Sequence, residues 1–364
     1  MTMSTEQAPA TEPVAPAKAA ADNAATENAA ETASETQAET GAETAPDAAA
    51  SVPKTPLAQL TTRLRDVTKK AGHSEMWGVD LSTDSAHAPT QVVLVKFLRA
   101  NNNNVAAAEK QLTSALEWRH KMQPGKLVSE AFDKNKFEDV GFVTVHHDAK
   151  EDRETVITWN IYGAVKDNKA TFGNVQDFIR WRTALMELGV QKLRLNEIKE
   201  PLALDAPDPH QMVQVHDYLS VSFFRMDPAV KAASKETIET FSMAYPELLA
   251  HKYFVNVPAI MGWMFGVMKV FLAPATLRKF HPMASGTTLA TELKDISASL
   301  PNEYGGQGPS VKEGQTVKLV DLAPETEEPT EADTAPLAEV PAAGPEPKPA
   351  GPEAEASNEK ETAA

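Results

Sequence analysis

The sequence predicts an α/β fold, in which a small helical subdomain precedes a mostly parallel sheet flanked by helices. Two observations support this prediction. Residues 55–122 carry apolar side chains at helical spacing, and beyond Pro124 short β-rich runs alternate with helical segments. Strands separated by helices form βαβ units, and such units build parallel sheets.

The two ends of the chain are rich in alanine, glutamate, threonine and proline. Residues 1–54 contain nine acids and two lysines, and the residues after 311 contain thirteen acids and four lysines. The ends therefore carry the whole formal net charge of −16, and the middle is electrically balanced. Such segments bury too little apolar surface to offset their ordering entropy. We expect disordered tails at 1–54 and 311–364, a helical subdomain over 55–125 and the sheet domain over 126–310.

Composition excludes several classes of protein. The chain has no cysteine, which removes disulfides, cysteine zinc sites and thiolate-ligated haem. A balanced core lacks the basic stripe of a nucleic-acid-binding protein, so no nucleic-acid partner is expected. The N-terminus lacks the basic region and apolar core of a targeting signal, and Glu6 and Glu12 interrupt it. We therefore expect a cytoplasmic protein, working in the cytosol or on cytosolic membrane faces.

Two helical segments are predicted in the front third of the chain. The first ends before Gly72, which stands where a C-cap glycine is expected, and its apolar stripe consists of Leu57, Leu60, Leu64 and Val67. The second segment spans 92–122, and the asparagines at 101–104 predict a turn that divides it into two helices. This part of the chain is therefore expected to be all-helical.

The remainder alternates strands and helices. We expect strands at 141–147, 155–163, 212–221 and 253–258, and helices at 175–193 and 227–249.

The strand predicted at 212–221 has one unusual face. Alternation places two sets of side chains on opposite faces: Val213, Val215 and Leu219, interrupted by Asp217, and Gln214, His216 and Tyr218. Strands covered on both faces are usually apolar on both. A polar stripe is tolerated where that face lines a cavity whose occupant supplies the partners. The pattern is compatible with a ligand beside this strand, and ordinary buried polar residues satisfied by their neighbours are the alternative.

The segment 258–274 is apolar nearly all round, with Lys269 as its only charge. It is shorter than the ~20 residues that a membrane span needs, and proline stands at both ends. Two interpretations remain, a buried core helix and a helix that covers an apolar cavity and swings toward a bilayer. We favour the second, and the methionines and aromatic side chains of the segment suit either a cavity or a bilayer.

Sequence motifs for catalysis are absent. There is no dinucleotide-binding glycine motif after a strand, no phosphate-binding loop, no zinc-protease motif and no hydrolase elbow. The glycines of 305–308 follow a helix, which argues against a phosphate cradle there. His146 and His147 are adjacent on a strand and point to opposite faces, so they do not share a metal. We expect a binding protein and not an enzyme.

Three stretches, in order along residues 55–308, resemble the CRAL-TRIO lipid-binding family. Phe97–Arg119 resembles the family's N-terminal helical signature, Ala244–Pro258 and the apolar helix after it resemble the core motif, and Ser299–Gly306 resembles the closing motif. The resemblance implies the fold stated above, with the apolar segment as a gate helix over a lipid cavity.

Within that family the chain is most similar to the fungal non-classical phosphatidylinositol transfer proteins, a branch that also binds haem b. This similarity rests on four sequence stretches, NIYG at 160–163, RWRTALME at 180–187, QVHDY at 214–218 and PELLAHKYFVNVP at 246–258. The sequence departs from the family at the four asparagines of 101–104 and in the connection 194–211. Neither departure touches the implied sites.

The resemblance implies two sets of site residues. Tyr218 would hold the haem iron, with His216 close by, and Tyr162, Arg182 and Lys252 would complete the pocket. Tyrosine phenolate is a known axial ligand of haem iron, and both the arginine and the lysine suit a haem propionate. For the lipid, Glu247 and Lys279 would bind the inositol ring and the phosphate. The alternative for these two is a surface ion pair of little consequence.

The expected function is therefore phosphatidylinositol binding and transfer between membranes, with haem b held through Tyr218. The expected partners are phosphatidylinositol and cytosolic membrane surfaces, contacted peripherally at the endoplasmic reticulum. One alternative is a haem enzyme of catalase or peroxidase type, with His216 as its acid–base group. Another is a haem or oxidant sensor that never transfers lipid. The sequence leaves the oligomeric state open, and whether haem and lipid exclude each other.

Overall fold

The structure, a computed structural model, describes residues 55–148, 150–221, 227–258 and 278–322. The predicted tail at 1–54, the tail beyond 322 and the apolar segment 259–274 lie outside the described residues. In the part of the chain that is described, no helix is long and apolar enough to cross a membrane.

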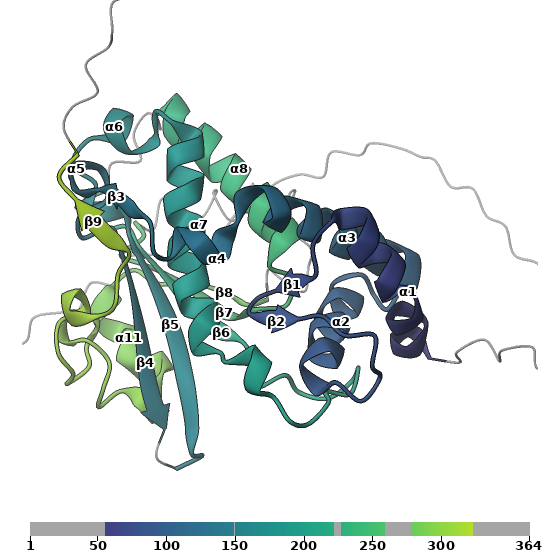
Figure 1. The fold of residues 1–364 in the computed structure, drawn as a ribbon. Helices are drawn as coiled ribbons and strands as arrows, with labels where there is room; N and C mark the ends of the chain where they lie inside the picture. Colours follow the sequence, from purple (N-terminus) through teal and green to yellow (C-terminus); the bar gives the residue numbers. More distant parts are fainter. Residues whose placement is uncertain (1–54, 149, 222–226, 259–277, 323–364) are drawn as a thin grey trace, which may run out of the picture. The chain divides into compact units, whose positions relative to one another are not determined.

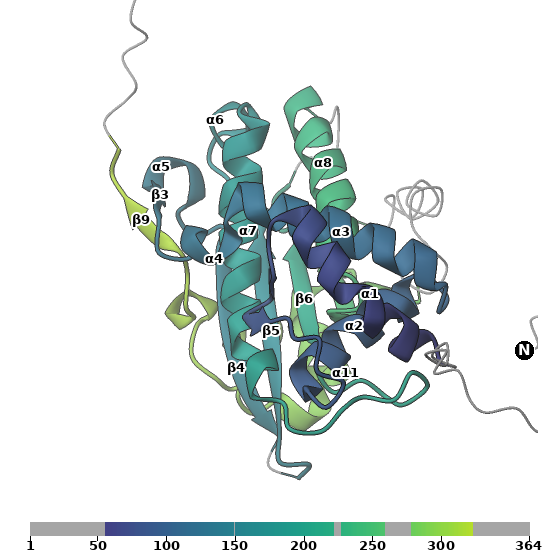
Figure 2. The same ribbon diagram turned by 45° about the vertical axis from the view of Figure 1, so that its right-hand side comes forward.

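The front third is helical, as predicted. Helix α1 (Pro56–Ala71) begins at Thr55, whose hydroxyl accepts the Ala58 amide, and ends at Gly72, whose φ of 63° is left-handed. Helices α2 (Ala88–Ala100) and α3 (Val105–Met122) are separated by the asparagine turn, and Asn104 caps α3 through the Ala107 amide. The three helices lie together (Figures 1 and 2), with α1 packed on α3. The confirmed cap positions show that local sequence fixes these ends.

A short antiparallel ribbon, β1 (Glu75–Met76) with β2 (Val79–Asp80), joins α1 to α2. No strand was predicted there. The ribbon turns through Trp77 and Gly78, which both have positive φ. The Trp77 indole is buried and donates to the Ala244 carbonyl at 3.1 Å. This contact ties the ribbon to a helix far along the chain.

The main sheet has five strands in the order β4-β5-β6-β7-β8. Strands β4 and β5 form an antiparallel hairpin, and the remaining neighbours are all parallel. The predicted mostly parallel sheet is therefore confirmed. The strands are β4 (Gly141–Asp148), β5 (Arg153–Ile161), β6 (Met212–Asp217), β7 (Leu249–Val255) and β8 (Phe280–Pro282).

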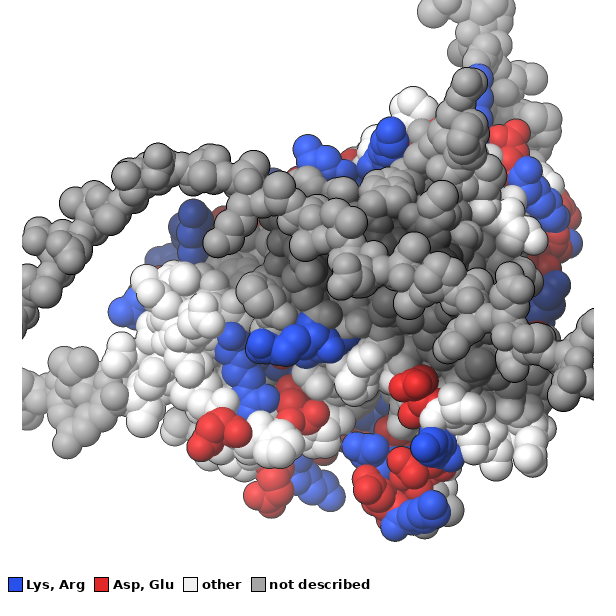
Figure 3. Space-filling view, turned by 180° about the vertical axis from the view of Figure 1, so that it is seen from behind, with Lys and Arg blue, Asp and Glu red and all other residues white. Residues whose placement is uncertain are grey.

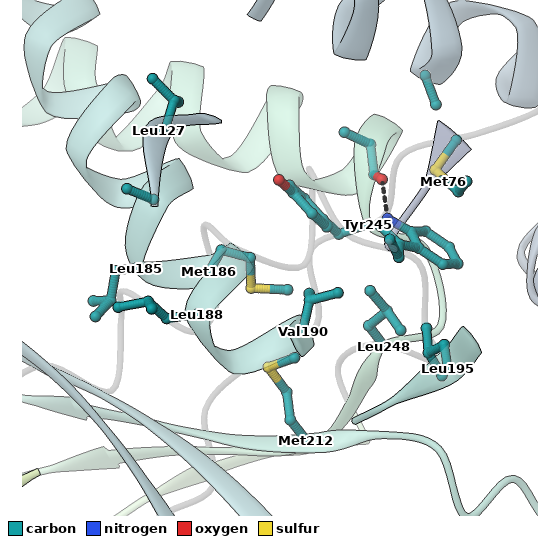
Figure 4. Close-up of a cluster of buried hydrophobic side chains, with 14 of the residues drawn as sticks. Met76, Leu127, Leu185, Met186, Leu188, Val190, Leu195, Met212, Tyr245 and Leu248 are labelled. Carbon is teal, nitrogen blue, oxygen red and sulfur yellow. Dashed lines mark hydrogen bonds between the residues drawn. The ribbon is translucent and has the colours of Figure 1, made fainter. Parts of the chain in front are cut away.

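Helices α7 (Val175–Lys192) and α8 (Pro228–Ala244) lie on one side of the sheet, and α11 (Leu289–Glu292) lies on the other side (Figures 1 and 2). An apolar cluster fills the space between α7 and the sheet. Figure 4 shows Met186 and Val190 of α7 between Tyr245 above and Met212 of the sheet below. The main core therefore sits beneath α7.

The two faces of β6 differ as the alternation predicts. Val213 and Val215 belong to an apolar cluster that also contains Trp159 and Tyr253, on the face away from α7. On the opposite face the Gln214 amide lies 3.6 Å from the Met186 sulfur of α7. The polar stripe therefore faces the layer formed by α7.

Several short elements connect these layers. They are α4 (Pro124–Leu127), β3 (Ala131–Asp133), α5 (Lys134–Phe137), α6 (Asn168–Phe172), and the 3-10 turns η1 (Tyr162–Ala164), η2 (Leu195–Glu197), η4 (Gly286–Thr288), η5 (Lys294–Ile296), η6 (Asn302–Tyr304) and η7 (Val311–Glu313).

The domain extends past the predicted boundary at residue 310. Strand β9 (Lys318–Val320) pairs in parallel with β3, and Gln315 exchanges two backbone hydrogen bonds with Val143. Val311 and Val317 are buried. Residues 311–322 therefore belong to the folded domain. The boundary was placed too early because the prediction rested on the acidic composition of the whole C-terminal stretch, which contains a few apolar residues that complete a sheet edge.

Several predicted element boundaries were wrong. The strand expected at 253–258 is Leu249–Val255, and the strand expected at 155–163 is Arg153–Ile161. The helix expected at 227–249 stops at Ala244, because Pro246 lacks an amide donor and Glu247 turns the chain with a φ of 54°. The strand expected at 212–221 stops at Asp217, whose carboxylate accepts the Leu219 amide at 2.8 Å and turns the chain. Both ends place a site residue on a turn.

Candidate functional site

Five residues singled out in the sequence converge on the α7 side of the sheet, and we call them the tyrosine site: Tyr162, Arg182, His216, Tyr218 and Lys252. They come from different elements. Tyr162 starts the turn η1 after β5, His216 lies on β6, Tyr218 follows β6, Lys252 lies on β7 and Arg182 lies on α7. Residues from the carboxyl ends of neighbouring parallel strands meet at one sheet edge, which is where such folds place their ligands.

Aromatic rings form the base of the tyrosine site. The ring of Tyr162 lies 5.4 Å from that of His216, edge-on, and 5.4 Å from that of Tyr218. Phe254 of β7 lies 5.6 Å from His216 and 6.4 Å from Tyr218. Four rings from three elements therefore stand against one another, with two phenols and one imidazole among them.

Arg182 is almost fully buried, with 1% of its surface exposed. Its guanidinium lies 5.0 Å from the centre of the Phe241 ring, and the Tyr162 phenol is close enough to oppose the lowering of its pKa. Among the described residues its Nε and Nη1 atoms have no hydrogen-bond partner. Burial lowers its pKa from the ordinary value, although it stays charged, as arginine does in proteins.

Lys252 presents its ammonium to two aromatic faces. Its Nζ lies 5.6 Å from the centre of the Phe254 ring and 5.5 Å from that of Phe280. Burial, and then the neighbouring charge of Arg182, lower the pKa of Lys252 to about 7. Two cationic groups therefore share this site, each beside aromatic rings.

The other titratable groups of the site favour their neutral forms. Burial, followed by the charges of Lys252 and Arg182, holds the pKa of His216 well below its usual range. Burial also raises the pKa of Tyr218 and of Tyr162, and the Arg182 charge opposes the rise at Tyr162. A phenolate at Tyr218 therefore needs a positive charge beside it, which a bound ferric ion would supply.

Two further residues of this face escaped the sequence analysis. Thr158 and Asn160 of β5 are fully buried and stand opposite Gln214 and His216 in the parallel register. Within the described residues, the Thr158 hydroxyl, the Asn160 carbonyl oxygen and the His216 Nε2 atom have no hydrogen-bond partner. Alternation along β5 could have identified the first two, because both share a face with the polar stripe of β6. Buried polar atoms without partners indicate a missing ligand or water.

Glu247 and Lys279 form a second site, which we call the headgroup pair. The Lys279 ammonium donates to the Glu247 carboxylate at 3.1 Å and to the Leu249 carbonyl at 2.8 Å. About a quarter of each side chain is exposed, 26% for the glutamate and 25% for the lysine. The pair is therefore ordered by hydrogen bonds and still reachable from solvent.

A buried lysine of α2 supports the headgroup pair from behind. The Lys96 ammonium is fully buried and donates to Asp208 at 2.7 Å, to the His210 carbonyl at 2.7 Å and to the Glu247 carbonyl at 3.1 Å. The Gln211 side-chain amide donates to the same Glu247 carbonyl at 3.1 Å. The helical subdomain thereby fixes the turn that carries Glu247. Sequence spacing gave no signal for this contact.

Asp217 interrupts the apolar face of β6. It is buried, and both of its carboxylate oxygens accept hydrogen bonds. Its carboxylate accepts from Asn256 at 2.7 Å, from the Tyr304 hydroxyl at 2.8 Å and from the Leu219 amide. Asn256 in turn accepts the Gly286 amide at 2.7 Å. This network ties the ends of β6 and β7 to the C-terminal turns, beside the tyrosine site.

The face seen from behind in Figure 3 carries charges of both signs. Lys and Arg side chains stand among Asp and Glu side chains along the rim of the residues that are not described. The visible part of this face is therefore not a uniformly basic surface. In the described ranges, no group of three or more His, Asp or Glu side chains is placed to hold a metal ion.

Comparison with known proteins gives two family matches. The CRAL/TRIO domain matches residues 138–306, and the CRAL/TRIO N-terminal domain matches residues 56–114. Together these stretches cover more than half of the chain.

Individual relatives are similar over most of the chain. The phosphatidylinositol transfer protein sfh5 of Sclerotinia sclerotiorum is 54% identical over 72% of this chain. The phosphatidylinositol transfer protein SFH5 of Coccidioides immitis is 51% identical over 79% of this chain. In both cases the match spans 64% of the relative's own length. The crystal structure of Sfh5 is 28% identical, with a TM-score of 0.60, over 72% of this chain and 90% of the solved one.

Proposed function

This chain belongs to the CRAL/TRIO family, and from its headgroup pair we propose that it binds phosphatidylinositol and transfers it between membranes. The name of the relatives supports the lipid class. The observation that carries the proposal is the ordered but accessible pair of Glu247 and Lys279. The protein works in the cytoplasm and contacts membranes peripherally, including those of the endoplasmic reticulum.

The chemistry of the pair suits an inositol phosphate. A carboxylate accepts hydrogen bonds from ring hydroxyls, and an ammonium binds phosphate as a point charge. Lys279 is held in place by Glu247 and by the Leu249 carbonyl before any lipid arrives. Little side-chain entropy is therefore lost on binding.

The acyl chains require an apolar enclosure, because each buried CH₂ group contributes about 0.8 kcal/mol. Phe254, Phe280 and Met186 supply apolar surface on the α7 side of the sheet. The apolar segment 259–274 completes this enclosure as a gate in our proposal. Release at a membrane follows when the gate opens.

Haem b, bound through Tyr218, is the second ligand of the proposal. The tyrosine site fits such a group in two respects. Its buried atoms include one His216 nitrogen and two Arg182 nitrogens that have no hydrogen-bond partner among the described residues, and its two cations suit the propionates. When bound, ferric haem supplies the positive charge that stabilises the Tyr218 phenolate. Arg182 and Lys252 would hold the propionates, and His216 would stand beside the ligand.

We favour binding over catalysis in this site. A peroxidase-type reaction needs an acid–base group on the open side of the iron. His216 and Tyr218 lie two residues apart at the end of one strand, and both rings contact that of Tyr162. His216 would therefore stand beside a group bound to Tyr218, and not on the open side opposite it.

The experiment combines two measurements on one preparation of the full chain. Freshly purified protein is scanned for a haem absorption band, and its extracted lipids are identified by mass spectrometry. Phosphatidylinositol in the extract, with transfer activity between vesicles, supports the lipid function. A band that disappears in Tyr218→Phe supports the haem function.

Controls separate the two functions. Glu247→Ala should abolish phosphatidylinositol transfer and leave the haem band in place. Lys312→Ala, which breaks an exposed ion pair with Asp139, should leave both unchanged. Extracts with phosphatidylcholine and no phosphatidylinositol, or transfer undiminished in Glu247→Ala, would contradict the lipid function. Peroxide turnover by the coloured protein would favour the enzyme.

A further inference from the structure

The buried charges of the tyrosine site lack a counter-charge. Arg182 is 1% exposed. Burial lowers its pKa, and the groups that oppose this lowering are the phenols of Tyr162 and Tyr245, not a carboxylate. The pKa of Lys252 is lowered by burial and then by the charge of Arg182. Among the described residues, neither cation forms an ion pair or hydrogen bond with a carboxylate. The two other fully buried cations of the described ranges each have one, Lys96 with Asp208 and Arg119 with Glu187, whereas Lys252 is only partly covered.

The sequence shows that the internal segments outside the description do not supply the missing acid. Residues 222–226 read SFFRM, and residues 259–277 contain no Asp or Glu and one lysine. These stretches therefore add only positive charge to the middle of the chain. The negative charge that balances Arg182 and Lys252 must come from elsewhere.

A buried charge without a partner is costly. Removing an ion from water costs several kcal/mol even after the protein relaxes, and a lysine avoids that cost by losing its proton. Arginine does not lose its proton in proteins. Arg182 therefore needs an acceptor with negative charge, and two of its nitrogens stand ready to donate.

We propose that Arg182 and Lys252, which we call the cationic pair, bind the carboxylate of a long-chain fatty acid, independently of haem. A carboxylate matches the donor geometry of guanidinium and is small enough for a site lined by rings. Phe241, Phe254 and Phe280 stand directly beside the two cations and suit the first methylenes of an acyl chain. The site that we propose consists of these described residues alone, and it lies on the same side of the sheet as the acyl-binding surface of the proposed function.

The headgroup pair would not serve this ligand. The Lys279 charge is offset by Glu247 at 3.1 Å, so a carboxylate there would meet a carboxylate. A ligand with both hydroxyls and phosphate satisfies both members of that pair, whereas a bare monocarboxylate satisfies only one. The cationic pair has no such acid, so it selects a simple anion. Haem and a fatty acid compete for it, because both bring a carboxylate.

The test uses haem-free full-length protein and cis-parinaric acid, a fluorescent fatty acid, titrated in the absence of membranes. We expect saturable binding, weakened by roughly tenfold or more in Arg182→Gln and in Lys252→Met, which corresponds to the loss of one charge-assisted contact. Lys252→Arg, which keeps the charge, should retain binding. Methyl parinarate has no charge. It should therefore bind the wild type no more tightly than it binds Lys252→Met. Lys312→Met is the surface control.

Measuring thermal unfolding of the variants shows whether a loss of binding is caused by misfolding. Because Lys252 stands beside the Arg182 charge and has no carboxylate partner among the described residues, Lys252→Met should unfold at the same or a higher temperature than the wild type. Equal affinity for the acid and its methyl ester, or full binding in Lys252→Met and Arg182→Gln, would overturn the proposal. The assay involves neither transfer nor iron, so its failure leaves phosphatidylinositol transfer and haem binding intact. Loss of transfer in Glu247→Ala, conversely, leaves this result standing.

Discussion

The ammonium of Lys279 lies 3.1 Å from the carboxylate of Glu247, although 32 residues separate them in the chain. The turn after α8 carries the glutamate with a φ of 54°, and the lysine immediately precedes β8. Parallel pairing of β7 with β8 then brings the two together, and the Lys279 carbonyl accepts the Lys252 amide at 2.7 Å. The same pairing links the headgroup pair to the cationic pair through the backbone of β7.

Lys279→Ala should reduce phosphatidylinositol transfer strongly and stability only slightly. The phosphate loses its cation, and we expect transfer to fall by roughly tenfold or more, the effect of one charged contact. A partly exposed ion pair contributes at most about 1 kcal/mol to folding. Vesicle transfer assays and urea unfolding measure the two effects. A fall in stability that matches the loss of transfer would point to misfolding instead of a lost ligand contact.

Lys96→Met should destabilise the protein by roughly 3 kcal/mol, because it removes the 2.7 Å ion pair of the buried Asp208 and leaves it only the longer contact with Arg99 at 3.8 Å. It also removes the donor that holds the Glu247 carbonyl, so transfer should fall in the fraction that remains folded. Urea unfolding measures the first effect. Arg63→Met is the matched control, since it breaks an exposed pair with Glu109 and should cost under about 1 kcal/mol. Equal losses in the two variants would contradict the role of burial.

His146 should stay neutral to unusually low pH. It is buried, and its ring nitrogens lie 2.7 Å from the Thr144 hydroxyl and 3.0 Å from the Ser299 hydroxyl. Burial lowers its pKa to about 4. Between that value and the ordinary value near 6.5, the unfolded chain binds the proton and the folded chain does not. Stability from this residue is therefore present above pH 6.5 and is lost as the pH falls toward 4.

Two measurements check the behaviour of His146. An NMR titration should show its imidazole signal unchanged until about pH 4. The stability of the wild type should decline more steeply between pH 6.5 and pH 4 than that of His146→Gln, which carries no titrating group there. An imidazole that titrates near its ordinary value would show that water reaches the ring.

Gly189→Ala should destabilise the fold, although alanine usually favours a helix interior by about 0.5–1 kcal/mol. An added Cβ at this position of α7 would stand 2.7 Å from the Thr158 methyl and 3.3 Å from the Met212 sulfur. The helix would have to move away from the sheet. Thermal unfolding of Gly189→Ala and of the double variant Gly189→Ala/Thr158→Ser tests this, because serine lacks the clashing methyl. Failure of the double variant to recover stability would contradict this contact as the cause.

The family resemblance and the patterns of apolar residues were enough to predict the order of the elements. The glycine at 72 and the asparagines at 101–104 marked helix ends because their preference is local. The alternation at 212–217 was enough to place Gln214 and His216 on one face and Val213 on the other, since strand geometry is periodic. The predicted mostly parallel sheet is confirmed on the same ground.

Other features were decided by contacts between distant residues. Residues 311–322 belong to the domain because β9 pairs with β3. The turn that carries Glu247 is held by a hydrogen bond from Lys96 of α2. Neither partner has a local signature, because the free energy of each contact arises only once the two segments are folded together.

The sequence by itself determined which residue types were available: two phenols, an imidazole, an arginine and a lysine at recognisable spacings, and no acid in the internal apolar segments. The packing of the described residues then brings Arg182 and Lys252 together with no carboxylate from those residues, while it brings Lys96 and Arg119 each to one. The physical reason is that the charge balance of a buried site is a sum over neighbours in space, which distance along the chain does not encode.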